Sequence, residues 1–222
     1  MLSVNRILIF LFIWVFSSSL YAVDVSNFDI KGIKLGMSEK QVLKKMPCSN
    51  PIKDLDKHPF GISGSYLTCG KYSESKSFML VTFDHNQKAY SILMDILFDV
   101  NPNLQKIENK FVKKYGNFYE AIENPTYKNP ANGYVKRFCW GSCRKYKIDD
   151  GAWKGYRFRW VENKQSQLLI KYENFSYKSN YYNHLEFTLI DSRLEIKQKK
   201  WAEKQGKIYR KQQKEKASNI DF

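Results

Sequence analysis

The fold of this chain is decided by the segment FMLVTFDHNQKAYSILMDILF, which runs from Phe78 to Phe98. Its two apolar stretches, 78–83 and 89–98, have the length of strands, and the polar residues between them have the length of a hairpin connection. In the second stretch, apolar side chains recur at every other position from Tyr90 onward, which is the period of a strand with one buried face. The segment therefore predicts an antiparallel strand pair.

A short helix is predicted on the N-terminal side of this hairpin. Ser38 and Gln41 have the spacing of a capping box, and Met37 and Val42 occupy the positions of a hydrophobic staple. Pro47 then ends the helix, because proline cannot continue it.

A second helix is predicted on the C-terminal side. Asn101 is a good cap residue, and Pro102 would occupy the first helical position, where proline is tolerated. An apolar stripe with helical spacing follows: Leu104, Ile107, Phe111 and Tyr115. Gly116 supplies a C-terminal stop.

Further strands are predicted at 156–162, 167–173 and around 185–189, the first two paired with each other. The order helix, cysteine-bearing segment, hairpin thus occurs twice, starting near Ser38 and near Asn101. We expect the α+β class: an antiparallel sheet with helices on one face, a possible tandem helix-hairpin repeat, and a long basic C-terminal helix.

The first 22 residues predict a secretory signal peptide. Asn5 and Arg6 precede an apolar run, 7–16, and the small residue Ala22 provides a cleavage site. The run is too short for a membrane span, which needs roughly 20 residues. The residue directly after Ala22 is Val23 and not a cysteine, so no lipid anchor is expected, and the predicted location is the periplasm.

The rest of the chain divides into three regions: a first α+β half, 23–100, a second half, 101–191, and a basic helical tail, 192–222. The tail opens with a second capping box at 192–195, and Leu194, Trp201 and Ile208 recur every seven residues. This seam is narrow, so we expect the first part of the tail to dock and the part after Gly206 to be frayed or exposed.

Four cysteines remain after the leader: Cys48, Cys69, Cys139 and Cys143. An even number in an exported chain favours two disulfides, for which three connectivities exist. We favour Cys48–Cys69 and Cys139–Cys143, because each pair is local and lies in its own half. The spacings of zinc ribbons and of thioredoxin-like redox pairs, both Cys-x-x-Cys, are absent.

The chain has a net charge of +15 at pH 7, which favours anionic partners. In a bacterial envelope these are acidic proteins, lipopolysaccharide and anionic lipid, while export disfavours nucleic acid. The segment 136–146 would present Trp140 between Arg137 and Arg144 on a disulfide-stiffened loop, a combination enriched in binding hot spots. The alternative, in which Trp140 packs inward on the sheet, stays open, and Trp201 on the tail is a fourth candidate contact.

No catalytic, cofactor or metal motif is recognised. The three histidines, His58, His85 and His184, share no metal-ligand spacing, and neither a nucleophile elbow nor a phosphate loop is present. Carboxylates brought together by the fold could still form a hydrolase site, and that alternative stays open.

The segment Ile30–Val42, with its Gly-Met-Ser helix start, resembles a motif of many small exported proteins of Gram-negative bacteria. Lys114-Tyr115-Gly116-Asn117 is similar to the ending of a later helix in the same proteins. The pattern also resembles small outer-membrane-assembly lipoproteins and tandem-repeat β-lactamase inhibitor proteins. The resemblance implies helices packed on an antiparallel sheet and assigns no functional residue, since the matching positions are caps and turns.

Together these features predict a non-enzymatic periplasmic protein that acts by stoichiometric binding, such as an inhibitor or immunity protein. Two other functions remain open. One is binding to lipopolysaccharide or anionic lipid through the basic tail, and the other is an unrecognised hydrolase.

Overall fold

A computed structural model describes residues 24–58, 61–71, 76–125, 133–149, 153–160, 166–177 and 180–218 of the chain. The predicted signal peptide, 1–22, lies outside the described residues. The described chain opens with a short 3-10 helix, η1 (Val25–Asn27), and a two-stranded sheet of β1 (Asp29–Ile30) and β2 (Ile33–Lys34).

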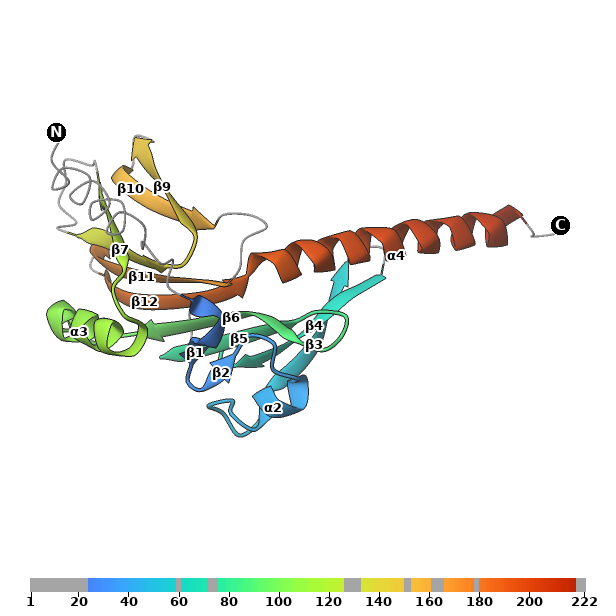
Figure 1. Cartoon of the computed structure of the whole chain (residues 1–222), viewed down its shortest axis with the longest axis horizontal. Helices are drawn as coiled ribbons and strands as arrows, with labels where there is room; N and C mark the ends of the chain where they lie inside the picture. Colours follow the sequence, from blue (N-terminus) through green and yellow to red (C-terminus); the bar gives the residue numbers. More distant parts are fainter. Residues whose placement is uncertain are drawn as a thin grey trace, which may run out of the picture.

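Ten further strands form one antiparallel sheet in the order β3-β4-β5-β6-β12-β11-β8-β7-β10-β9 (Figure 1). The strands from the first half of the chain are β3 (Ile52–His58), β4 (Gly61–Cys69), β5 (Ser77–Phe83) and β6 (Ala89–Leu97). Those from the second half are β7 (Tyr119–Pro125), β8 (Tyr134–Trp140), β9 (Cys143–Asp149), β10 (Trp153–Trp160), β11 (Ser166–Tyr177) and β12 (Asn180–Asp191). The predicted hairpin around residue 85 is confirmed as β5–β6.

The first predicted helix is confirmed as α2 (Glu39–Leu43). The Ser38 hydroxyl accepts from the Gln41 backbone N–H, and the Gln41 side chain accepts from the Ser38 N–H, which completes the capping box. With only five residues, α2 buries a single side chain, Val42, so it contributes little to the core by itself.

The second predicted helix is confirmed as α3 (Leu104–Tyr115), and Gly116 caps its C-terminus with a φ of +80°. The predicted N-terminal cap, Asn101, is wrong by two residues, because the Asn103 side chain accepts from the Lys106 N–H. Asn101 instead accepts hydrogen bonds from the Tyr172 hydroxyl and from Asn174 on β11.

The main core lies on one face of the sheet. The strand register places Phe138, Ile170, Phe187, Met94 and Met79 opposite one another in a row across five strands. This face is covered by α3, α2 and the β1–β2 pair, whose buried side chains join the same cluster. Figure 1 shows these elements together below the sheet.

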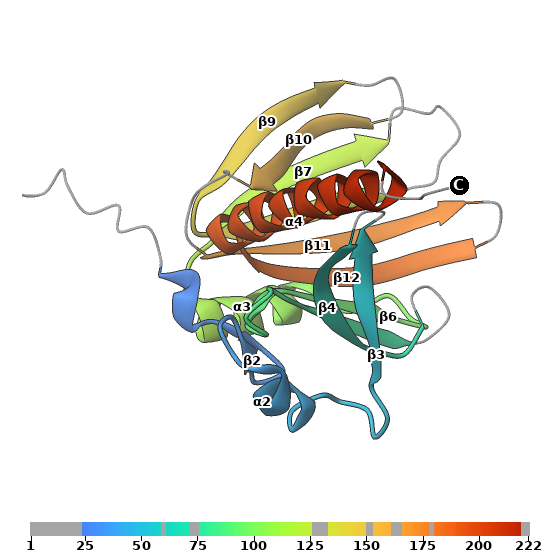
Figure 2. The same cartoon turned by 90° about the vertical axis from the view of Figure 1, so that its right-hand side faces the viewer.

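The C-terminal helix, α4 (Ser192–Ser218), lies on the other side. It contacts β4, β6 and β12. Gln198 Nε2 lies 3.5 Å from the point that a Cβ on Gly64 would occupy, on the side of β4 away from the core. Figure 2 shows α4 running between strands β7 and β10 on one side and strands β3 and β4 on the other. The α+β class and the long C-terminal helix are confirmed, and the structure adds that the helices divide between the two faces.

The sheet order is symmetric about the β6–β12 pair once β9 and β10 are set aside. Each half then consists of one helix followed by four strands, and its last strand forms the junction between the halves. The topology therefore matches the expected repeat, with the β9–β10 hairpin inserted into the second half.

One strand pairing was wrong. The segments 156–162 and 167–173 were expected to pair, but β10 pairs with β9 and β7, whereas β11 pairs with β8 and β12. The reason lies in burial: Leu168, Ile170 and Tyr172 of β11 are buried on the core face, which requires a central place in the sheet. The tail cap was also misplaced, because the Asp191 carboxylate, and not Ser192, accepts from the first N–H groups of α4.

Candidate binding surfaces

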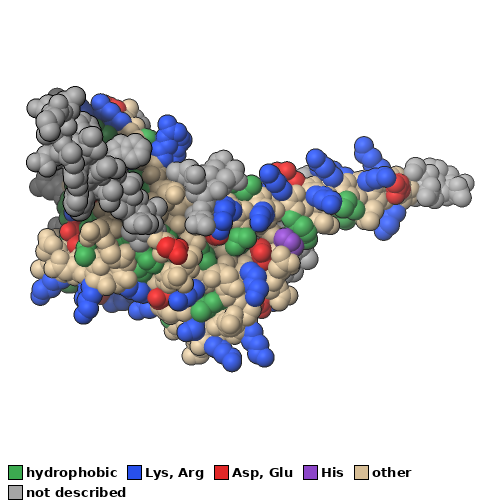
Figure 3. Space-filling model, in the orientation of Figure 1, with side chains coloured by type: hydrophobic (Ala, Val, Ile, Leu, Met, Phe, Trp, Pro, Cys, Tyr) green, Lys and Arg blue, Asp and Glu red, His purple; other side chains and the backbone are tan. Residues whose placement is uncertain are grey.

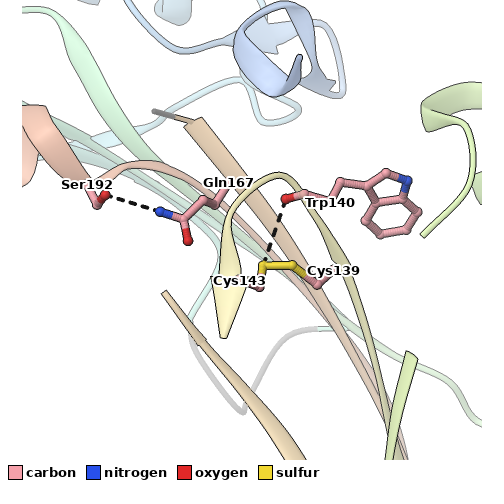
Figure 4. The surroundings of a disulfide bond; sticks show 5 residues. All are labelled: Cys139, Trp140, Cys143, Gln167 and Ser192. Carbon is pink, nitrogen blue, oxygen red and sulfur yellow. Dashed lines mark hydrogen bonds between the residues drawn. A yellow bond between two sulfur atoms is a disulfide. The ribbon is translucent and has the colours of Figure 1, made fainter. Parts of the chain in front are cut away.

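Both favoured disulfides are present. Cys48 and Cys69 are bonded with Cα atoms 5.8 Å apart, and Cys139 and Cys143 with Cα atoms 6.4 Å apart. The first links the segment after α2 to the end of β4. The second links the end of β8 to the start of β9 and thereby holds the base of the inserted hairpin (Figure 4).

Trp140 is not a surface residue: its predicted exposure between two arginines is wrong, and the alternative of inward packing is confirmed. Its side chain is 1% exposed, and the indole Nε1 donates to the Gly116 carbonyl oxygen at 3.0 Å. It packs edge-on against Phe111, Tyr115 and Phe118. Neighbouring residues of a strand point to opposite faces. Because Cys139 and its disulfide lie on one face of β8, the Trp140 side chain lies on the other face, in the core. In Figure 4 the indole points away from the disulfide.

The two arginines lie on different strands, Arg137 on β8 and Arg144 on β9 of the inserted hairpin, and do not converge on Trp140. Arg137 is half-buried on the same face of β8 as Cys139, and it lines a shallow pocket with Arg159 and Lys171. Arg144 is exposed on β9, directly opposite Arg159. The predicted contact of one aromatic and two cations is therefore not assembled.

Trp201, a candidate contact for a partner, instead packs within the protein. Its ring stacks on His85 of the β5–β6 turn, with centroids 4.7 Å apart and planes 6° apart. Gln198, one turn earlier, accepts from both the backbone N–H and the Nδ1 position of His85, at 2.9 and 2.8 Å. These contacts fasten the first half of α4 to the sheet.

The second half of α4 projects from the body. The helix continues to Ser218, and residues 207–216 are all exposed (Figure 1). The expectation that the chain after Gly206 is frayed or exposed is confirmed as exposure for residues 207–216, which remain helical. Figure 3 shows Lys and Arg side chains along the whole projecting helix.

Seven of these cations form a continuous stripe, which we name the basic stripe. They recur at alternating steps of four and three residues, and all are exposed: Arg193, Lys197, Lys200, Lys204, Lys207, Lys211 and Lys214. Such steps keep side chains on one face of a helix, and the stripe is about 32 Å long at a rise of ~1.5 Å per residue.

The basic stripe is exposed to solvent and lies to one side of the face of α4 that docks on the sheet. At 3.6 residues per turn, its centre is about 120° around the helix from the face that carries Gln198 and Trp201. Ion pairs hold Arg193 to Asp191 at 3.2 Å and Lys211 to Glu215 at 3.8 Å. The other five cations have no described carboxylate within ion-pair distance, so their charge is available to a partner.

A buried charged cluster lies on the same sheet face as Cys139. His184 of β12 contacts Asp95 of β6 through Nε2 and Glu173 of β11 through Nδ1, the latter at 2.8 Å. Burial by itself would lower the His184 pKa, but hydrogen bonds to Asp95 and Glu173, together with the charge of Asp95, outweigh it and raise the pKa to about 9. Burial would raise the pKa of Glu173, but the hydrogen bond from His184 and the Lys171 charge hold it below its usual range.

This cluster resembles a catalytic acid–base group but lacks the free base. At pH 7 an imidazole with a pKa of about 9 is protonated, and each ring nitrogen already faces a carboxylate. A general base needs an unprotonated nitrogen near the working pH. The cluster therefore acts as an ion-pair link between β6, β12 and β11.

Within the described residues, no group of three or more His, Cys, Asp or Glu side chains is arranged to hold a metal ion. None of the described helices combines the length and apolar character that crossing a bilayer requires.

Comparison with protein-family models, with curated proteins and with solved structures gives no match for this chain. The basic stripe is therefore identified from the chain's own geometry. Its spacing is visible in the sequence, but whether the stripe faces the sheet or solvent is set by the docking of Gln198 and Trp201.

Proposed function

We propose that this protein is a non-enzymatic binding protein of the bacterial envelope that attaches to an anionic membrane surface through α4. The observation that carries the proposal is the basic stripe, seven exposed cations in one row along a helix whose second half projects from the sheet. The predicted leader and the two disulfides support export.

A flat anionic surface suits this geometry. All seven cations of a straight stripe can approach such a surface together, and each lysine or arginine near it contributes about 1 kcal/mol. The side chains already paired with Asp191 and Glu215 contribute less, so we expect several kcal/mol in total. Phosphate groups of lipopolysaccharide and of anionic phospholipid offer the same chemistry.

The test is co-sedimentation of the oxidised protein with vesicles. We expect binding to vesicles with phosphatidylglycerol or lipopolysaccharide and none to pure phosphatidylcholine. Raising the salt concentration should weaken binding, since exposed charges are screened within about 10 Å at 0.1 M salt. Comparing the two anionic vesicles identifies which source of phosphate is preferred.

Two double variants separate the stripe from overall charge. Lys204→Gln with Lys207→Gln removes two stripe cations, and Lys199→Gln with Lys216→Gln removes two cations from other faces of α4. The stripe variant should bind about 30-fold more weakly, because two contacts of about 1 kcal/mol are lost. Equal weakening in both variants would show that binding depends on net charge alone. If the protein bound an acidic protein saturably and did not bind vesicles, its partner would be that protein and not a membrane.

The narrower idea of an inhibitor or immunity protein stays a prediction. It requires a tight complex of equal stoichiometry with an envelope protein. A pull-down from periplasm with the stripe variant and the control variant checks it, since such a complex should survive the loss of the stripe.

A further inference from the structure

A cavity of about 440 Å³ lies on the core face, between α3, the β1–β2 turn and strands β6 and β12. Its floor is apolar and includes Met94, Ile96, Leu185 and Phe187, and α3 adds Ile107 and Phe111. Ligand sites typically have volumes of roughly 300–1,000 Å³ and mostly apolar walls, so this cavity has the size and lining of one.

The polar groups of this cavity are cationic. Lys31, Lys110 and Lys114 line it, and no carboxylate is found among its described lining residues. Lys114 is held by Asp29, whose carboxylate lies 2.9 Å from Nζ. Lys31 and Lys110 are exposed and have no ion pair with a described carboxylate, so two cations at the rim are available to a ligand.

Lys31 has an unusual backbone. It occupies the first central position of the β1–β2 turn with a φ of +54°, followed by Gly32 at +79°. A turn with two positive φ values favours Asn, Asp or Gly at the first position, and a lysine there is strained. Strain of this kind concentrates at functional sites, and here it holds an ammonium group at the cavity.

A second cavity of about 430 Å³ continues the first and shares Lys31, Met94 and Ile96 with it. Its lining includes the Cys48–Cys69 disulfide, Phe78 and Met79. The two cavities thus extend along the sheet on either side of Lys31.

We propose that this cavity pair binds a single acyl chain that ends in an anionic headgroup. The chain would lie on Met94, Ile96 and Phe187, and the carboxylate or phosphate would be bound by Lys31 and Lys110. This site is separate from the basic stripe, because it lies on the core face under α3 and includes no residue of α4.

The experiment measures fluorescence of cis-parinaric acid with the purified oxidised protein, followed by displacement with palmitate, lysophosphatidate or hexadecanol. The two anionic competitors should displace the probe about tenfold more effectively than the neutral alcohol, because only they pair with the lysines. The better of the two anions identifies the headgroup as carboxylate or phosphate.

The decisive variant is Lys31→Asn with Lys110→Gln. Asparagine suits the positive φ of the turn, so the fold should be kept or stabilised while the ammonium is lost. We expect about tenfold weaker binding of the probe, with hexadecanol affinity unchanged. Lys113→Gln, on α3 outside the cavity, is the matched control and should bind as the unmodified protein does.

This proposal is overturned by no probe binding, by equal displacement by hexadecanol and palmitate, or by unchanged binding by the Lys31/Lys110 variant. The stripe variant Lys204→Gln/Lys207→Gln should bind the probe normally. Loss of probe binding in that variant would place the acyl chain on α4 and also reject the cavity.

Discussion

The two halves of the sheet fasten their helices in different ways. In the first half, the Cys48–Cys69 disulfide joins the segment after α2 to the last residue of β4. In the second half, the indole of Trp140, the last residue of β8, donates to the carbonyl of Gly116, which directly follows α3. Each of these strand ends is followed by a glycine with positive φ, Gly70 or Gly141.

Helix length explains the difference. The five-residue α2 buries only Val42, which is too little apolar surface to hold its end in place, so a covalent link supplies what packing cannot. The twelve-residue α3 buries Phe111 and Tyr115, and their rings form an aromatic cluster with Trp140. The second half can therefore use its cysteines for the inserted hairpin instead.

The largest effect is expected from Trp140→Ala. Removing a buried tryptophan from a core costs about 3–5 kcal/mol in unfolding free energy, and here the Gly116 carbonyl also loses its donor. Urea unfolding of the oxidised protein measures this. Trp140→Phe keeps most of the packing and should cost much less. A smaller loss of unfolding free energy for Trp140→Ala than for removal of the Cys48–Cys69 disulfide would contradict the claim that Trp140 fastens the second half.

The next largest loss of unfolding free energy is expected from removing the Cys48–Cys69 disulfide. Cys48→Ala with Cys69→Ala opens a loop with a sequence separation of 21 residues, which should lower the unfolding free energy by about 3 kcal/mol in the chain-entropy model. Hydrogen exchange should rise most in β4 and in the segment after α2. An unchanged melting temperature would show that α2 is held by packing after all.

A smaller effect tests the junction between the halves, where Asp95 of β6 meets His184 of β12. Because folding raises the His184 pKa from 6.5 to about 9, its stabilisation is complete below pH 6.5 and is lost as the pH rises through 9. We expect the unfolding free energy to fall by about 2 kcal/mol between pH 7 and pH 9. His184→Gln should flatten this slope, and an equal slope in that variant would place the pH dependence elsewhere.

The smallest effect is expected from the hairpin disulfide. Cys139→Ala with Cys143→Ala opens only a short loop, with a sequence separation of 4, so the loss should be at most about 2 kcal/mol. Exchange should increase in β9 and β10 while β6 and β12 stay protected. A global loss as large as that of Trp140→Ala would mean that the hairpin disulfide, and not the indole, fastens the second half.

The sequence predicted the features that local chemistry determines. The β5–β6 hairpin, the Ser38 capping box and the Gly116 stop each depend on residues within one short segment, and both local disulfides are as predicted. The pairing of β10 was missed because its choice between β9 and β11 depends on which strand occupies the centre of a ten-stranded sheet.

The binding surfaces were harder to predict for the same reason. The segment 136–146 was expected to be a loop, whereas residues 134–140 form β8, and the face of β8 that meets α3 decides that Trp140 is buried while Arg137 is only half-buried. The spacing of the basic stripe was present in the sequence, yet its exposure to solvent follows from the docking of Trp201 on His85. The lysine-rimmed cavity joins residues of β1, β6, α3 and β12, which no local pattern connects.

Hydrogen exchange of the oxidised protein, with and without phosphatidylglycerol vesicles, tests most directly that α4 is the contact with an anionic surface. Residues 207–216 are exposed and project from the body, so without vesicles their amides should exchange faster than those of the sheet. We predict that vesicles slow exchange across 207–216 and leave β5 and β11 unchanged. Slowed exchange that is confined to other elements, with 207–216 unaffected, would contradict the proposed function.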